Sequence, residues 1–171
     1  MSKSLRKEVV LPYPPEKVWV ALTDRAALAE WLMPNDFEPV VGRKFRLQVD
    51  GMGSYSGLNE CEVLEVDEPR KLVYNWVLVP GKAGAPRPKP MVLTWTLEPS
   101  GSGTKLTLVQ EGLEALGFFN RLSMAFGWGT MLNRWIPQVL TQVEGGHFVP
   151  GPKRLVKRCY GIKTIPDDLT R

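Results

Sequence analysis

The sequence predicts an α+β fold with an antiparallel sheet, two short helices after the first strand and a long C-terminal helix. Six segments between residues 5 and 111 have strand character, and four of them carry apolar residues at every second position. Between residues 118 and 143 the apolar positions instead recur at intervals of three and four, as on one face of a helix. The change of period separates a sheet from a helix that follows it.

The predicted first strand covers residues 5–11, and helices are predicted at 15–22 and 25–31. Pro15 suits a helix entrance, because proline is tolerated in the first helical turn, where its missing N–H is not needed. Val18 and Leu22 then fall at helical spacing. This part of the chain therefore predicts a strand that leads directly into two short helices.

Five further strands are predicted at residues 43–50, 55–67, 71–79, 91–98 and 103–111. The alternating apolar residues should face the core: Phe45, Leu47, Val49, Leu72, Tyr74, Trp76, Leu78, Leu93, Trp95, Leu97, Leu106 and Leu108. Asp50-Gly51 and Ser100-Gly101-Ser102-Gly103 supply residues that tolerate tight turns. Consecutive strands joined in this way form an antiparallel meander.

A segment rich in proline and glycine, Pro80 to Pro90, joins two of these strands. It is longer than the roughly two to five residues that a hairpin needs, so we expect an exposed extension. It is either a lid or partner-binding loop, or a surface insertion without a function of its own.

A long amphipathic helix is predicted over residues 117–144, and Gly127, Gly129 and Pro137 interrupt its pattern. Because an internal proline removes a hydrogen bond, we expect a bend near residues 134–137. The bend could open room for a ligand, or it could only fit the helix to a curved sheet.

Several short motifs occur in order over about residues 5 to 145: Pro15-Glu16-Lys17-Val18-Trp19, Leu22-Thr23-Asp24, Trp31, Val41-Gly42, Val63-Leu64-Glu65-Val66, Leu72-Val73-Tyr74-Asn75-Trp76, Leu93-Thr94-Trp95, Gly103-Thr104-Lys105-Leu106-Thr107-Leu108 and Gly127-Trp128. Together they carry a resemblance to the family named after the activator of the 90-kDa heat-shock protein ATPase, within the SRPBCC superfamily. It implies a helix-grip fold, in which a curved antiparallel sheet wraps around the C-terminal helix and leaves a cavity between them. START lipid-transfer domains and polyketide cyclases belong to the same superfamily, so the fold alone does not define a reaction.

Composition and charge are those of one globular domain with a basic extension. The chain has 171 residues, of which 43% are hydrophobic and 23% charged. Residues 147–171 carry six basic and two acidic side chains, so this segment accounts for the whole net charge of +4. We therefore predict a START-like domain at 1–146 and a basic extension at 147–171. The extension either packs on the body or a neighbouring subunit, or contacts anionic lipid, nucleic acid or an acidic partner. The neutral body gives no reason to expect nucleic-acid binding.

Location and cysteine usage follow from the same sequence. No apolar run reaches the roughly 18 residues of a membrane span, and the polar start at residues 1–8 lacks a signal-peptide core, so we expect a cytoplasmic protein. Cys61 and Cys159 form no CxxC pair and suggest no disulfide framework.

Six residues are predicted to form the wall of a ligand pocket between sheet and helix: Tyr74, Trp76, Trp95, Phe118, Leu122 and Phe126. Aromatic residues with a polar tip can surround an apolar ligand and still donate one hydrogen bond. The alternative is that these residues only fill a solid core.

No catalytic, metal or cofactor site is predicted. His147 is the one histidine of the sequence, and beside a predicted helix end it is better placed to interact with terminal carbonyls than to act as a base. Glu60 and Glu62 are expected on the solvated face of the sheet, although they and Gln110 would enter a cavity if the alternation were shifted by one residue.

Three functions of different classes remain. The leading one is binding of a small hydrophobic or amphipathic ligand by a carrier, sensor or sequestering protein. The second is a protein-interaction module that resembles the chaperone activator. The third is a polyketide-cyclase-like enzyme, which is less favoured because no acid-base pair stands out. The oligomeric state and the ligand's identity do not follow from the sequence.

Overall fold

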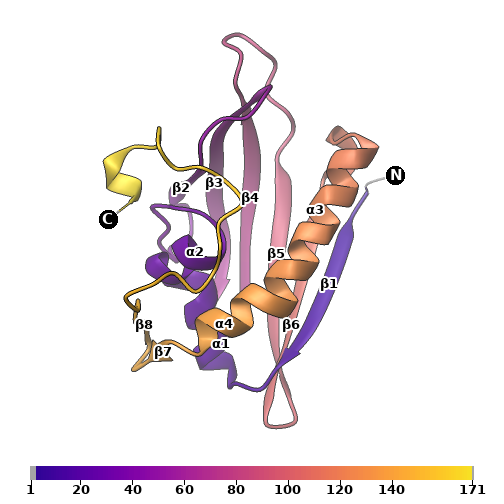
Figure 1. Cartoon of the computed structure of the whole chain (residues 1–171). Helices are drawn as coiled ribbons and strands as arrows, with labels where there is room; N and C mark the ends of the chain where they lie inside the picture. The colour runs from indigo at the N-terminus through magenta and orange to yellow at the C-terminus, as the bar shows by residue number, and fades with distance from the viewer. Residues whose placement is uncertain (1–2, 171) are drawn as a thin grey trace.

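The computed structural model describes residues 3–170, without the side chain of Ala115, and in this range the chain builds a six-stranded antiparallel sheet in the order β1-β6-β5-β4-β3-β2 (Figure 1). The strands are β1 (Leu5–Leu11), β2 (Lys44–Gln48), β3 (Tyr55–Asp67), β4 (Lys71–Pro80), β5 (Met91–Ser100) and β6 (Gly103–Glu111). All adjacent pairs are antiparallel, which confirms the predicted α+β fold and its sheet.

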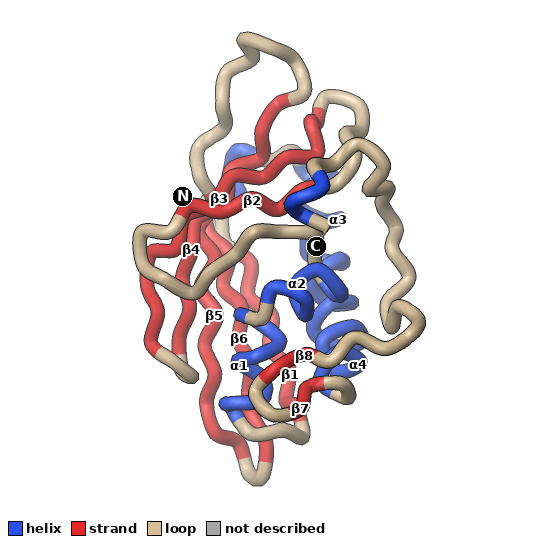
Figure 2. The backbone as a smooth tube through the Cα atoms, turned by 90° about the vertical axis from the view of Figure 1, so that its left-hand side faces the viewer, coloured by secondary structure: helices blue, strands red, loops and turns tan. Residues whose placement is uncertain are grey.

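The helices cover one face of this sheet (Figures 1 and 2). They are α1 (Pro15–Thr23), α2 (Arg25–Trp31), α3 (Phe118–Thr130) and α4 (Ile136–Leu140), with a 3-10 turn at Leu113–Ala115. Asp24 separates α1 from α2, and its carboxylate accepts hydrogen bonds from the N–H groups of Ala26 and Ala27 at 2.8 and 3.0 Å. The carboxylate thereby caps the start of α2 and fixes the angle between the two helices.

The core lies between the sheet and these helices. Nearly all the alternating strand residues predicted to face inward are buried, among them Phe45, Leu72 and Leu106. Leu78, near the end of β4, is only partly buried.

The C-terminal helix is interrupted where the sequence predicted a bend. Met131–Trp135 forms a π-helical turn between α3 and α4, in which the Ile136 N–H reaches back five residues to the Met131 carbonyl. Pro137, which has no N–H to donate, follows directly in α4. The irregular turn thus lets the helix continue past the proline.

The predicted helical range of 117–144 is too long. The helix ends at Leu140, and β7 (Val143–Glu144) then pairs with β8 (His147–Phe148) in a small hairpin. Gly145 and Gly146 turn the chain with φ angles of 57° and 81°, which only glycine adopts readily. These two glycines are the local reason for the hairpin.

After β8 the chain runs back across α2 and β2, as the yellow segment of Figure 1 shows. The Asp50 carboxylate accepts hydrogen bonds from the N–H groups of Lys163 and Thr164 at 2.9 and 2.7 Å, and these bonds lower its pKa. Glu30 accepts from the Leu155 N–H at 2.6 Å. The burial of Val156 agrees with the expected docking of the extension's apolar residues, and the division into residues 1–146 and 147–171 stays a prediction.

Candidate ligand-binding site

A row of aromatic rings fills the middle of the space between the sheet and α3. Trp31 lies 6.0 Å from Trp95, Trp95 lies 5.7 Å from Trp128, and Trp128 lies 6.1 Å from Trp76, measured between ring centroids. Each pair is arranged edge to face, which is a favoured packing for aromatic rings. All four indoles are buried, so this region is solid core.

The polar tips of these rings have partners within the protein. Trp95 Nε1 donates to the Tyr74 hydroxyl at 3.0 Å, and Trp128 Nε1 donates to Gln110 Oε1 at 2.8 Å. Burial raises the pKa of Tyr74, so this phenol stays neutral. Gln110 therefore faces inward as a hydrogen-bonding support for α3.

The side chain of Asn59 on β3 lies at the centre of a group of hydrogen bonds within the core. Its side chain is fully buried, and Oδ1 accepts a hydrogen bond from Trp76 Nε1 at 2.7 Å. Its Nδ2 donates to the Leu47 carbonyl at 3.0 Å and to the Tyr55 hydroxyl at 2.6 Å. Burial raises the pKa of Tyr55 to about 12. One amide thus joins β2, β3 and β4 beneath a cavity.

Above Asn59, an apolar cavity of about 200 Å³ lies between β3, β4 and the inner face of α3. A groove of about 670 Å³ adjoins it, and Tyr55, Leu78 and Met124 line both. The inner cavity is otherwise lined by Leu32, Met33, Asn59, Trp76, Gly127, Trp128 and Met131. The two adjoining spaces, together called the path below, share these three wall residues: Tyr55, Leu78 and Met124.

The outer groove lies between the start of α3 and the loop that connects β4 to β5. Ala85, Pro86 and Pro88 of this loop form one wall, which places the unusually long connection beside the path. The loop is also tied to the sheet, because Arg87 Nη2 lies 2.6 Å from a carboxylate oxygen of Glu60. The polar side chains at the groove are Ser54, Lys82, Asn120 and Ser123.

The six predicted wall residues are divided among three places. Trp76 lines the cavity, whereas Tyr74 and Trp95 are buried within the aromatic core. Phe118, Leu122 and Phe126 are 65%, 59% and 79% exposed on the outer side of α3. The prediction that these three side chains face inward is therefore wrong. Contact of any of the six residues with a ligand stays a prediction.

The wrong prediction of which α3 side chains face the sheet has a simple origin. The face of α3 that meets the sheet carries Met124 and Trp128 and continues with Met131 of the π-helical turn, and the opposite face is apolar as well. Helical periodicity identifies apolar faces but does not say which of two meets the sheet. Met124, Leu78 and Asn59 were missed as cavity residues, although the alternation along β3 places Asn59 on the same side as Val63.

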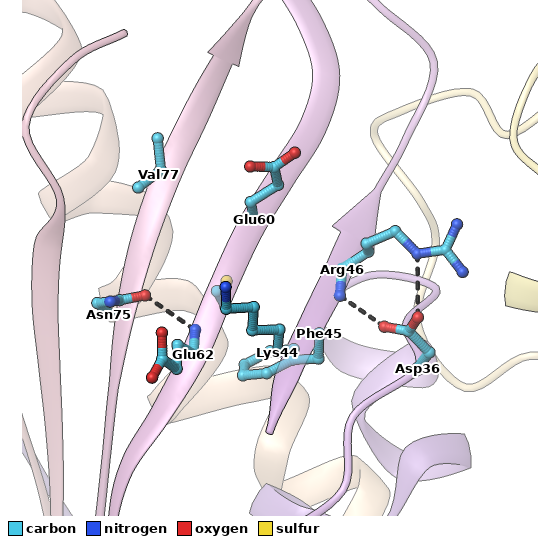
Figure 3. Close-up of a pocket in the computed structure, with 9 residues that line it drawn as sticks. Asp36, Lys44, Phe45, Arg46, Glu60, Glu62, Asn75 and Val77 are labelled. Carbon is cyan, nitrogen blue, oxygen red and sulfur yellow. Dashed lines mark hydrogen bonds and ion pairs between the residues drawn. The ribbon is translucent and has the colours of Figure 1, made fainter. Parts of the chain in front are cut away.

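A second hollow, of about 500 Å³, lies on the outer face of β2, β3 and β4 (Figure 3). Glu60 and Glu62 lie here, as the sequence predicted, next to Lys44 and Arg46 on the neighbouring strand. Arg46 Nε pairs with Asp36 at 3.0 Å. Paired charges of both signs at an open surface are typical of the solvated side of a sheet, and we do not assign a function to this hollow.

His147 is exposed in β8 and is not among the residues that line the cavity, the groove or the outer hollow. Among the described residues, no cluster of three or more histidine, cysteine or acidic side chains is arranged to hold a metal ion. Likewise, no helix within residues 3–170 is long and apolar enough to cross a membrane. The cytoplasmic location stays a prediction.

Solved structures with this architecture include protein MLL2253 from Mesorhizobium loti, which is 32% identical, with a TM-score of 0.70 over 83% of this chain and 99% of that one. Protein BH1534 from Bacillus halodurans is 28% identical, with a TM-score of 0.64 over 81% of this chain and 96% of that one. The Aha1 dimer from Colwellia psychrerythraea, at 16% identity and a TM-score of 0.62 over 76% of this chain and 90% of that one, shows the common fold alone. No curated protein matches the sequence.

The model of one family, described as Activator of Hsp90 ATPase homolog 1-like protein, matches residues 12–140, which is well over half of the chain. This range runs from the end of β1 to the end of α4 and so includes the strands and helices that form the cavity. The sheet, the two short helices and the C-terminal helix together have the helix-grip arrangement of a ligand-binding type of fold. The chain therefore belongs to the Activator of Hsp90 ATPase homolog 1-like family of the SRPBCC superfamily.

Proposed function

We propose that this protein binds a small amphipathic molecule in the path formed by the cavity and the groove. The observation that carries the proposal is that the two spaces adjoin and share Tyr55, Leu78 and Met124 as wall residues. Their volumes of about 200 and 670 Å³ are in the range of small-molecule sites. A carrier, a sensor or a sequestering protein would use such a site in the same way.

The distribution of polar groups suggests how a ligand lies. The inner end is formed by Trp76, Trp128 and Met131, which suit an apolar body. The mouth carries the ammonium group of Lys82 and the side chains of Asn120 and Ser123, which suit a polar or anionic head group. We infer a ligand with an apolar tail and one acidic or hydrogen-bonding end.

The chemistry of the walls supports holding a ligand over transforming it. The described lining residues of cavity and groove include no carboxylate, imidazole or thiol, and Tyr55 stays protonated well above neutral pH because of its burial. General acid-base catalysis works best with groups whose pKa lies near the working pH. A cyclase-like reaction would have to depend on shape and hydrogen bonds alone.

The experiment is a pair of fluorescence titrations with probes of similar apolar size. Anilinonaphthalene sulfonate carries one negative charge, and N-phenyl-1-naphthylamine is neutral. We expect both to bind, and we expect Met124→Trp, which fills the junction of cavity and groove, to weaken both by about tenfold or more. Lys82→Gln should weaken the anionic probe selectively.

Met52→Trp is the matched control, because Met52 is 65% exposed and lies outside the path. This variant should bind both probes as the parent chain does. Equal binding by the parent chain and a folded Met124→Trp variant would place the probes elsewhere and refute the proposed site. Native mass spectrometry and organic extraction of the purified protein would then identify any ligand retained from the cell.

A further inference from the structure

The outer face of α3 presents large apolar side chains to solvent. Phe118, Phe119, Leu122 and Phe126 are 65%, 81%, 59% and 79% exposed. Their spacing of one, four and eight residues places them on one side of the helix, and we call these four residues the outer face of α3. Three of the six phenylalanines of the chain are on it. A cluster of exposed aromatic side chains of this kind marks an interaction surface.

From residue 115 to residue 143 the charge has one sign, and the nearest acidic residue before α3 is Glu114 in the 3-10 turn. Between Glu114 and Glu144 the sequence contains two charged residues, Arg121 and Arg134, and both are basic. Lys7 of β1 adds a third, because its Nζ lies 3.9 Å from the position that a Cβ on Gly129 would occupy. Its ammonium group is thus beside α3, one turn beyond the last phenylalanine. Lys82 is exposed at the groove on the other flank.

An aromatic helix face flanked along its length by cations fits a surface with an apolar interior and a negatively charged boundary. A second copy of the chain fits less well, because a two-fold interface would bring Arg121 of each copy to the same basic surface without an acidic partner. We propose that the outer face of α3 docks on an anionic lipid surface. The phenylalanines enter the region between head groups and acyl chains, and Arg121 and Lys7 contact lipid phosphates.

Docking in this way brings the mouth of the groove near the lipid. Asn120 and Ser123 line the groove and belong to the same helix turns as Phe119 and Leu122. If the proposed ligand binding holds, an amphipathic molecule would pass between bilayer and groove with little exposure to water. The docking itself depends only on the outer face and its basic neighbours.

The test is co-sedimentation of the full chain with vesicles of phosphatidylcholine alone and of phosphatidylcholine with about one quarter phosphatidylglycerol. We expect binding to the anionic vesicles that weakens with added salt. The double variant Phe119→Ser/Phe126→Ser should lose about tenfold or more in vesicle affinity, since the apolar anchors are gone. The variant Lys7→Gln/Arg121→Gln should bind the anionic vesicles less tightly. The binding that it retains should not weaken with added salt.

The matched control is Val40→Ser/Val41→Ser, which removes two residues that are 57% and 60% exposed in the segment before β2. It should bind vesicles as the parent chain does. Absence of binding to anionic vesicles, or equal binding by the phenylalanine variant, would overturn the proposal. So would a dimer in sedimentation velocity that the phenylalanine variant converts to monomer, because the face would then be covered by a second copy.

The Met124→Trp variant separates this proposal from the proposed ligand site. It blocks the path without touching the outer face, so it should still bind vesicles even where it no longer binds the naphthalene probes.

Discussion

Replacing Asn59 by alanine tests whether its hydrogen bonds stabilise the part of the core beside the cavity. The amide is fully buried and accepts the Trp76 N–H at 2.7 Å while donating to Leu47 and Tyr55. Asn59→Ala removes these hydrogen bonds and leaves the buried Trp76 N–H and Leu47 carbonyl without this partner. An unsatisfied buried group costs about 1 to 3 kcal/mol, and the lost volume adds to it. We expect the free energy of unfolding to fall by about 2 to 4 kcal/mol.

Equilibrium urea denaturation followed by far-UV circular dichroism measures this change. The matched control is Asn75→Ala, because Asn75 lies on the adjacent strand and accepts one hydrogen bond, from the Glu62 N–H at 2.8 Å, while remaining partly exposed. We expect the control to cost about 1 kcal/mol or less. The slope of the unfolding free energy against urea concentration should be the same in both variants as in the parent chain, so that the midpoints of the three unfolding curves can be compared.

A double-mutant cycle with Trp76→Phe isolates the central hydrogen bond. Once the indole N–H is absent, Asn59→Ala no longer leaves that donor unsatisfied and should cost about 1 to 2 kcal/mol less than in the parent chain. A coupling near zero, or an Asn59→Ala cost no larger than that of Asn75→Ala, would refute the role assigned to Asn59.

Three further predictions concern single groups. Ellman's reagent should titrate one thiol quickly in the folded chain, the exposed Cys159, and the second, Cys61, only in denaturant, because burial raises the pKa of Cys61 and excludes the reagent; two fast thiols would contradict this. Burial raises the pKa of Tyr55 to about 12, above the roughly 10 of an unfolded chain, so its contribution to stability is complete below pH 10 and is lost between pH 10 and 12. Between pH 9 and pH 11 the free energy of unfolding, measured with urea, should therefore fall less in Tyr55→Phe than in the parent chain. An equal fall would argue against the raised pKa of Tyr55. Asp24→Ala should lower the free energy of unfolding by about 1 to 2 kcal/mol through loss of the α2 cap, and Asp24→Asn, which still caps, should cost less.

The sheet could be predicted from sequence because its signal is local. Alternation along β4 and β5 requires only that Leu72, Tyr74 and Trp95 be apolar, and each of them is buried as expected. The turns could be predicted as well, since Gly53 and Gly101 have the positive φ angles that glycine adopts most readily. The family resemblance added the relation of the sheet to the C-terminal helix.

The site was less predictable because it depends on which faces meet. Phe126 and Trp128 are both apolar and two residues apart, yet one is exposed and the other buried. Asn59 is a polar residue in a strand, and its structural role comes from hydrogen bonds to Leu47, Tyr55 and Trp76 that form only in the folded sheet. The cavity exists where Leu78 and Met124 approach without filling the space, which is a property of the packed molecule and not of any segment.

The extension that crosses α2 and β2 has a consequence for the order of events during synthesis. Its anchoring contacts join residues far apart in sequence: Lys163 to Asp50 over 113 residues, Leu155 to Glu30 over 125, and Asp168 to Arg25 over 143. The ribosome releases the chain from its N-terminal end, so the sheet can assemble while these last contacts are still missing. For that interval Asp50 and Glu30 have no extension to bind, and a nascent chain stalled before residue 155 would leave both carboxylates without these partners.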